Sequence, residues 1–251
     1  MLNTKVIILA LAGVFALKFV DADSGIKYVK AKDTIEMYGH LGSLGLRLLT
    51  IDDLLPIKSL MNVTLSEDPL FVGTGISTDD ESRDYLREKW ISYIAQNKSF
   101  VWVEKSKMIG LNILYVDDGS RTSIPHRLLP ELSLYYNILS DPQLSFNMTE
   151  KYGVDRFLNS AVFWVNKDYR NPENLQKMLQ FREAICVLNG IGATSAYFTM
   201  VDEGFEAYNV GYETDGRMSY TSIAQKYGGF KTYKIRDSLF LTRKTLKYII
   251  D

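Results

Sequence analysis

The spacing of apolar residues predicts two well-defined helices. One follows Thr78, and its apolar side chains recur at helical spacing at Leu86, Trp90, Tyr93 and Ile94. The clearer helix is predicted over Asn174–Asn189, and Gly190–Gly192 ends it. Its apolar positions include Leu175, Met178, Leu179, Ile185 and Cys186. Both patterns are typical of helices that bury one face against a sheet.

Shorter apolar and β-branched runs predict strands between these helices. Leu46–Leu49 is the first, and Ser160–Val165 and Ala193–Val201 predict two more. Phe100–Glu104 and Met108–Tyr115 are joined by three polar residues, which predicts a hairpin with a bulge at Gly110.

Two capping boxes locate helix starts. Thr50-Ile51-Asp52-Asp53 opens a helix in which Pro56 falls in the first turn, where its missing N–H is tolerated. Thr78-Asp79-Asp80-Glu81 opens the helix that carries Trp90.

The remaining segments complete an α/β order. Glu131–Leu139 and Met218–Tyr227 predict short helices, and Gly204–Arg217 predicts a polar loop. Phe230–Ile235 and Ser238–Leu241 predict two last strands that pair. The order is β-α-α-β-β, an insert, then β-α-β-α-β-β, which predicts an α/β (α+β) fold. Because no Pro/Gly/Ser-rich linker interrupts the chain, we expect a single domain over residues 23–251.

Composition excludes several classes of protein. The 251 residues include 29 Lys+Arg and 30 Asp+Glu, so the formal net charge of −1 argues against nucleic acid as a partner. The single cysteine, Cys186, cannot form a disulfide within the chain and is expected to be inert and buried. With only His40 and His126 as histidines, we expect no metal site. The sequence has no serine-hydrolase elbow, phosphate-binding loop, zinc-protease motif or dinucleotide fingerprint.

The N-terminal segment predicts secretion. Val6–Leu17 is an apolar run shorter than the roughly 20 residues that a membrane-spanning helix needs, but long enough for the core of a signal peptide. Val20-Asp21-Ala22 supplies a cleavage site, so we expect residues 1–22 to be a signal peptide and the mature chain to start at Asp23. An uncleaved membrane anchor and an apolar first strand are the alternatives.

Three N-glycosylation sequons give modest support to secretion. They begin at Asn62, Asn97 and Asn147, and only exposed asparagines can carry a glycan. The chain is therefore expected to be an extracellular glycoprotein without stable membrane insertion.

The predicted order and four local segments resemble the GNAT superfamily of acyl-CoA N-acyltransferases. The segments are LRLLTIDDL (46–54), VWVEKSKMIGLN (101–112), VFWVNKDYR (162–170) and SIAQKYGGF (222–230). Within the superfamily, Glu67-Asp68-Pro69-Leu70 is similar to the Asp-Glu-Pro-Leu of the arylalkylamine N-acetyltransferase-like branch. The resemblance covers most of residues 45–241. It implies a mixed, mostly antiparallel central sheet flanked by helices, and acetyl-CoA as cofactor.

The coenzyme loop departs from the family pattern. The family has Arg/Gln-x-x-Gly-x-Gly/Ala between a strand and a helix, and here only Arg170 matches. Glu173 and Leu175 replace the small residues, and Pro172 removes an amide donor. A carboxylate about 5 Å from a phosphate charge costs about 3 kcal/mol at an effective dielectric constant of about 20. The resemblance places cofactor contacts at Val165, Arg170, Asn171 and Asn174, but we expect acetyl-CoA to bind weakly or not at all.

The same segment is typical of a helix N-terminus that binds no phosphate. Asn171 can cap the helix, Pro172 can be its first residue, and Glu173 can face the positive end of the helix dipole.

The resemblance also implies catalytic positions. Asp68 stands where the branch has a glutamate that accepts the amine proton, although it could equally cap a turn before Pro69. Tyr220 and Ser222 are hydroxyls of the kind the branch uses to protonate the leaving thiolate, although hydroxyls at a helix start commonly act as caps.

Two functions remain open. The first is a secreted protein of the arylalkylamine N-acetyltransferase type whose transfer activity is weakened or lost. The second is a secreted, non-enzymatic protein that binds a small amine or aromatic ligand in the acceptor cleft. Aromatic residues near the last central strand are expected to line that cleft or to pack in the core: Tyr197, Phe198, Phe205, Tyr208, Tyr212 and Tyr220.

Overall fold

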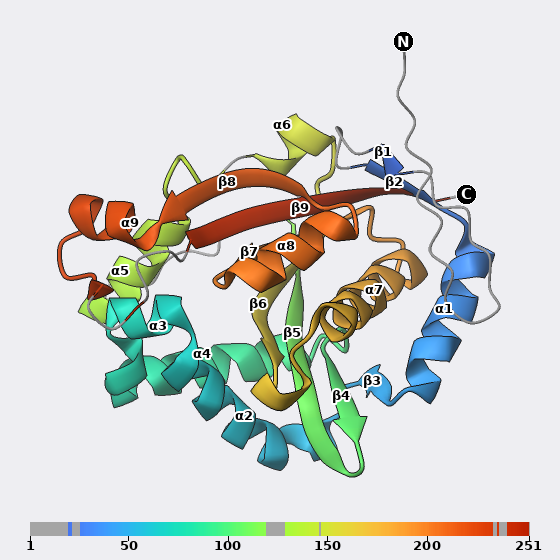
Figure 1. Ribbon diagram of the computed structural model, residues 1–251, viewed down its shortest axis with the longest axis horizontal. Coiled ribbons are helices and arrows are strands. Elements are labelled where there is room, and N and C mark those ends of the chain that lie inside the picture. The colour runs from blue at the N-terminus through green and yellow to red at the C-terminus, as the bar shows by residue number, and fades with distance from the viewer. Residues whose placement is uncertain are drawn as a thin grey trace.

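The protein is described by a computed structural model that covers residues 20–21, 26–118, 129–145, 147–232, 235 and 240–250. Within these ranges nine strands form one mixed sheet in the order β1-β2-β9-β7-β6-β5-β4-β3, and β8 pairs with β9 (Figure 1). The strands are β1 (Val20–Asp21), β2 (Ile26–Val29), β3 (Leu46–Leu48), β4 (Phe100–Glu104), β5 (Lys107–Asp117), β6 (Phe157–Val165), β7 (Ala193–Phe198), β8 (Glu213–Ser219) and β9 (Phe240–Ile250).

Helices cover both faces of the sheet. The α-helices are α1 (Ala31–Ser43), α2 (Leu54–Glu67), α3 (Pro69–Thr74), α4 (Asp80–Ile94), α5 (Pro130–Leu139), α6 (Met148–Tyr152), α7 (Pro172–Leu188), α8 (Val201–Asn209) and α9 (Tyr220–Lys226). Short 3₁₀ turns are η1 (Ile51–Asp53), η2 (Ile76–Thr78) and η3 (Lys167–Tyr169). Figure 1 shows α7 and α8 together in front of the sheet and α2, α3 and α4 grouped at the lower left.

Alternating strand residues supply a hydrophobic core to each face. Phe100 and Trp102 of β4 pack in the core that includes α1, α7 and α8, whereas Val101 between them packs in the core that includes α2 and α4. This alternation is the period of two that a strand requires. The α2–α4 core contains the predicted helix face, since Leu86, Trp90 and Ile94 are buried.

The two halves of the sheet separate between β6 and β7. These neighbours run parallel, but they pair at only two positions, Leu158↔Thr194 and Asn159↔Ser195. After that the strands diverge, and Figure 1 shows β8 and β9 crossing the top of the view while β5 and β6 run steeply downward. Ligands of such sheets bind in the crevice outside the carboxyl ends of diverging parallel strands. The fold therefore places a candidate site there.

Most predicted elements are confirmed. The strands at 46–48 and 100–117, the helices at 54–67, 80–94, 130–139 and 172–188, and the mostly antiparallel sheet all form. The hairpin turns through Lys105 and Ser106, both with positive φ, and its bulge lies beside Gly110. The second helix is capped one residue later than predicted, because Asp79 rather than Thr78 accepts the N–H of Ser82.

The predictions for the last fifty residues are partly wrong, and no element was predicted between residue 23 and Leu46. Val201 begins α8 rather than ending a strand, and Gly204–Arg217, predicted as a loop, contains most of α8 and most of β8. The last strand is the long β9, and the predicted strand at 230–235 does not form in its described residues. The helix α1 was not predicted. The predicted signal peptide, apart from Val20–Asp21, and His126 lie outside the described residues.

Candidate functional site

An arginine joins the two diverging strands at their carboxyl ends. Arg170 follows β6, while Asp202 and Glu203 lie in the first turn of α8, just after β7. Arg170 donates from Nε to Asp202 Oδ2 at 2.6 Å and from Nη2 to Asp202 Oδ1 at 2.8 Å, and its Nη2 lies 2.9 Å from Glu203 Oε1. We call these ion pairs the Arg170 bridge. The bridge connects the segment after β6 to the start of α8. It uses Arg170, the residue that matches the coenzyme-binding pattern of the family.

The start of α7 is occupied by its own side chains. Asn171 is the N-cap, and its side chain accepts the N–H of Asn174 at 3.0 Å. Pro172 is the first residue of the helix, and Glu173 pairs with Lys177 at 2.7 Å. The predicted cap is therefore confirmed.

These residues do not fit the phosphates of acetyl-CoA. The capping oxygen of Asn171 takes an amide that a phosphate would need, Pro172 has none, and Glu173 brings a negative charge. Leu175 is 1% exposed and packs with Met178 and Leu179. Asn174 uses its side-chain amide to donate to the carbonyl of Tyr169, at 2.7 Å.

Asp68 lies beside the carboxyl end of β7, next to Thr199. It is the N-cap of α3, where its carboxylate accepts from the N–H of Leu70 and from Thr199 Oγ1, each at 2.8 Å. Burial is the main cause that raises the pKa of Asp68, and the hydrogen bond from Thr199 opposes it. Both uses predicted for Asp68 are thus compatible with its position: it caps a helix and also faces a cavity.

Glu203 is a second carboxylate at this end of the crevice. Burial raises its pKa to about 7, and the negative charges of Asp68 and Asp202 act in the same direction. Arg170 lowers the pKa of Glu203 but is shared with Asp202, so burial outweighs it. We call Asp68 and Glu203 the acidic pole.

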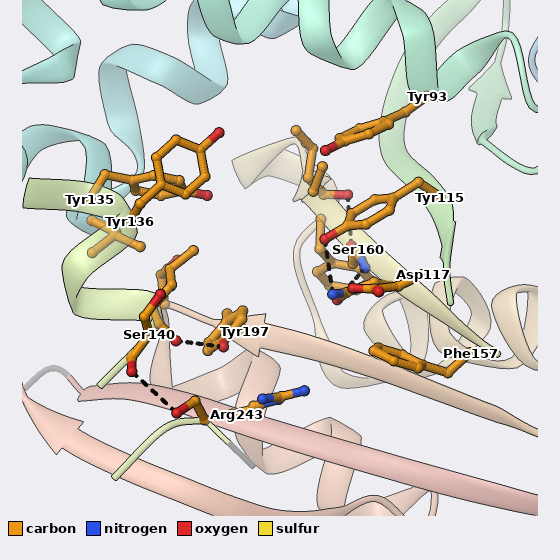
Figure 2. A pocket seen from close by; sticks show the side chains of 18 of the residues that line it. Tyr93, Tyr115, Asp117, Tyr135, Tyr136, Ser140, Phe157, Ser160, Tyr197 and Arg243 are labelled. Carbon is orange, nitrogen blue, oxygen red and sulfur yellow. Dashed lines mark hydrogen bonds between the residues drawn. The ribbon is translucent and has the colours of Figure 1, made fainter. Parts of the chain in front are cut away.

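A cavity of about 1000 Å³ extends from the acidic pole between the sheet and helices α4 and α5. Figure 2 shows Tyr135 and Tyr136 on one side of it, Tyr93 and Tyr115 on the other, and Tyr197 and Arg243 below. Tyr93 stacks on Tyr115 with ring centroids 4.2 Å apart, and Asn159 donates to the hydroxyl of Tyr115 at 2.9 Å. The cavity is therefore walled by aromatic rings that are themselves held in place.

The hydroxyl groups of this wall are neutral. Burial raises the pKa values of Tyr93, Tyr115, Tyr135, Tyr136 and Tyr197 above the ordinary value of 10. Lys89 and Arg243 are the basic residues among those that line the cavity. Tyrosine faces next to carboxylates are the environment that organic cations prefer.

Two of the three predicted catalytic residues come together. Asp68 accepts from the side chain of Thr199, and the hydroxyl of Tyr220 donates to the carbonyl of Thr199 at 3.4 Å. Tyr220 is buried and stacks on Phe230. Ser222 lies apart, where its Oγ contacts Ser219 Oγ at 2.7 Å at the start of α9.

The other predicted positions have structural partners. Val165 is buried at the end of β6, opposite Gly110 of β5. Cys186 is buried, and burial raises the pKa of its thiol to about 12, as expected for an inert residue. The described residues contain no group of His, Cys, Asp or Glu side chains arranged to hold a metal ion. No helix in the described ranges has the length and apolar character needed to cross a membrane.

The aromatic residues expected near the cleft mostly lie elsewhere. Of that set, only Tyr197 lines the cavity. Phe198, Tyr212 and Tyr220 are buried in the core, and Phe205 and Tyr208 are exposed on α8. The residues that do line the cavity on α4, β5 and α5 were missed because their spacing could be explained by core packing alone.

No family model and no curated protein sequence matches the chain. Solved structures do match. An arylalkylamine N-acetyltransferase 2 from Aedes aegypti superposes with a TM-score of 0.67 at 13% identity, over 80% of this chain and 97% of that one. A polyamine N-acetyltransferase from Drosophila melanogaster gives 0.61 at 14% identity, over 80% and 98%. The C-terminal condensation domain of Ebony, in complex with β-alanyl-dopamine, gives 0.56 at 12% identity, over 80% and 97%. The chain therefore has the fold of the GNAT acetyltransferases, as the resemblance predicted.

Proposed function

We propose that this protein binds a small aromatic amine in its tyrosine-walled cavity and has little or no acetyltransferase activity. The Arg170 bridge carries the proposal. In this bridge Arg170, the one residue of the coenzyme loop that matches the family, is paired with Asp202 and Glu203. Glu203 also lines the cavity, which has a volume of about 1000 Å³.

The lining of the cavity supports an amine as the ligand. An ammonium group placed beside Asp68 would gain a charge-assisted hydrogen bond to a carboxylate that already has two donors in fixed positions. The tyrosine rings supply apolar area and electron-rich faces for the remainder of the molecule. Solved structures with this fold support the same proposal, since they include an arylalkylamine N-acetyltransferase, a polyamine N-acetyltransferase and a condensation domain in complex with β-alanyl-dopamine.

We further propose that the protein is secreted after cleavage of residues 1–22 and carries N-linked glycans. Asn97 and Asn147 are exposed, so each has room for a glycan. Asn62 is half-buried on α2, and its side-chain oxygen accepts from Arg87. A glycan is therefore expected at Asn97 or Asn147 rather than at Asn62.

Equilibrium binding of 2-phenylethylamine tests this function. Calorimetric titration of the mature protein with 2-phenylethylamine is expected to show saturable binding in the absence of acetyl-CoA. The matched neutral alcohol 2-phenylethanol, which lacks the ammonium group, is expected to bind at least about tenfold more weakly, a difference of about 1.4 kcal/mol. An assay of CoA release with the same amine and acetyl-CoA is expected to stay at the uncatalysed rate. Absence of amine binding, or rapid turnover, would contradict the proposal.

A further inference from the structure

A lysine faces the cavity with only aromatic partners. Lys89 of α4 donates from Nζ to the hydroxyl of Tyr136 at 2.9 Å, and Nζ lies 4.8 Å from the ring centroid of Tyr136 and 6.0 Å from that of Tyr85. Within the described part of the chain, no carboxylate lies within 4.0 Å of this ammonium group. Asp117 and Asp155 also line the cavity, but Lys89 pairs with neither.

This environment leaves the charge of Lys89 incompletely compensated. Burial lowers the pKa of Lys89, and no acidic group among the described residues counteracts that effect. By contrast, the exposed Lys151 has two carboxylates, and Arg170 has Asp202 and Glu203. A cation removed from water gains most from an anion that arrives with its own charge-assisted hydrogen bond. Lys89 is therefore suited to an anionic group of the ligand.

Two tyrosine rings separate Lys89 from the acidic pole. Tyr136 contacts Lys89, and its ring centroid lies 5.0 Å from that of Tyr135. Tyr135 in turn packs on Phe71 of α3, the helix that Asp68 caps, with ring centroids 5.5 Å apart. One wall of the cavity thus runs from a carboxylate, past two aromatic rings, to an ammonium group.

We infer that the ligand is a bipolar aromatic compound, with an amine at one end of its ring and an anionic group, such as a carboxylate or a sulfate ester, at the other. The amine would lie against Asp68, the ring between the tyrosine pairs, and the anion against Lys89. This inference rests on the proposed function, since it assumes that the amine site is used. An α-amino acid does not meet the requirement, because both of its charges lie at the same end of its side chain.

Calorimetry with two matched probes tests the inference. The probes are 2-phenylethylamine and 4-(2-aminoethyl)benzoate, which differ only in the carboxylate opposite the amine. The protein is expected to bind the benzoate about tenfold more tightly. Lys89→Met is expected to remove that preference, so that the two probes bind with affinities within about twofold of each other, whereas Lys89→Arg is expected to keep it. Lys32→Met, on the exposed face of α1, is the control and should retain the preference.

The possible failures can be told apart. If both probes bind equally to the unmodified protein, or if Lys89→Met keeps the preference, the bipolar ligand is wrong while the amine site stands. If neither probe binds, the proposed function fails and the inference fails with it. Should Lys89→Met not fold, Lys89→Glu provides the second test, because it is expected to favour 2-phenylethylamine over the benzoate.

Discussion

Replacing Arg170 by methionine is expected to lower the free energy of unfolding by about 3–5 kcal/mol at pH 8, the usual effect of removing one partner from a buried ion pair. Methionine keeps most of the side-chain volume, so the loss reports the charge. The Arg170 side chain is 14% exposed and that of Glu203 only 4%. The substitution therefore leaves the Glu203 carboxylate inside the protein without its counter-ion. Urea denaturation at fixed pH measures the difference.

The stability lost in Arg170→Met is expected to be smaller at acidic pH, because Glu203 is then protonated. Burial raises the pKa of Glu203 in the folded protein to about 7, above its ordinary value of 4.5. The folded state therefore holds this proton between those values, and the contribution of Glu203 to stability falls as the pH rises through them. At pH 5 Glu203 is neutral with or without Arg170, so the expected loss is that of the ion pair with Asp202, which remains ionised but is 48% exposed, about 1–2 kcal/mol.

A surface arginine provides the control. Arg156→Met, at an exposed position before β6, is expected to change stability by no more than about 0.5 kcal/mol at either pH. A loss for Arg170→Met that is the same at pH 5 and pH 8 would contradict the assigned role of Glu203. A loss below about 1 kcal/mol at pH 8 would show that the Arg170 bridge contributes little to the stability of the fold.

Asp68→Asn is expected to weaken the binding of 2-phenylethylamine about 30-fold, or about 2 kcal/mol. An ion pair about 4 Å apart at an effective dielectric constant of about 20 is worth about 4 kcal/mol, and desolvation of the ammonium group offsets part of it. Glu203 does not replace the lost charge, because Arg170 already holds that carboxylate at 2.9 Å. Calorimetry gives the affinity directly.

The substitution is chosen to preserve the fold. Asparagine caps helices about as well as aspartate, so the N–H of Leu70 keeps an acceptor and stability should change by less than about 1 kcal/mol. Asp79→Asn is the matched control, since Asp79 also caps a helix, accepting from Ser82 at 2.8 Å, but does not line the cavity. An unchanged affinity for Asp68→Asn would place the amine elsewhere.

The N-terminal end of α7 was predictable because its signals are local. A capping asparagine, a proline at the first helical position and an apolar stripe all act within a few residues of one another. The burial of Leu175, however, could not be predicted from the loop pattern alone. A glycine at this position would remove a core side chain at a cost of about 3–5 kcal/mol, so restoring the family pattern there would damage the fold.

The helix α8 escaped prediction because its burial pattern is inverted. Its acidic residues Glu203 and Glu206 are buried, whereas its apolar residues Val201, Phe205 and Tyr208 are exposed. No side chain caps its start at Met200, and Gly204 interrupts the pattern. The position of Glu203 in the site therefore depends on a partner, Arg170, that lies more than thirty residues away in the sequence.

Most of the central strand β9, beyond the strand predicted at Ser238–Leu241, was missed for a related reason. Its middle residues Arg243, Lys244 and Thr245 are polar, although all three are buried. Long-range hydrogen bonds allow this: Arg243 Nε donates to Ser195 Oγ at 3.3 Å, and Lys244 Nζ donates to Thr214 Oγ1 at 2.7 Å. Hydrophobic periodicity cannot detect a strand whose buried positions are satisfied by distant polar partners.

The cavity wall could be predicted only as a core. Tyr93, Tyr115 and Tyr135 come from α4, β5 and α5, and their spacing is that of ordinary buried positions. Only the tertiary arrangement shows that these side chains surround a space. Lys89 gave no signal at all, because a lysine on a helix is normally exposed to solvent.

Titration of the mature protein with acetyl-CoA tests most directly whether its own side chains have closed the coenzyme site. Calorimetry is expected to detect no saturable binding up to about 1 mM, which corresponds to less than about 4 kcal/mol of binding free energy. The same sample should bind 2-phenylethylamine, which establishes that it is folded. A micromolar dissociation constant for acetyl-CoA would contradict the closure by Arg170, Asn171, Pro172 and Glu173.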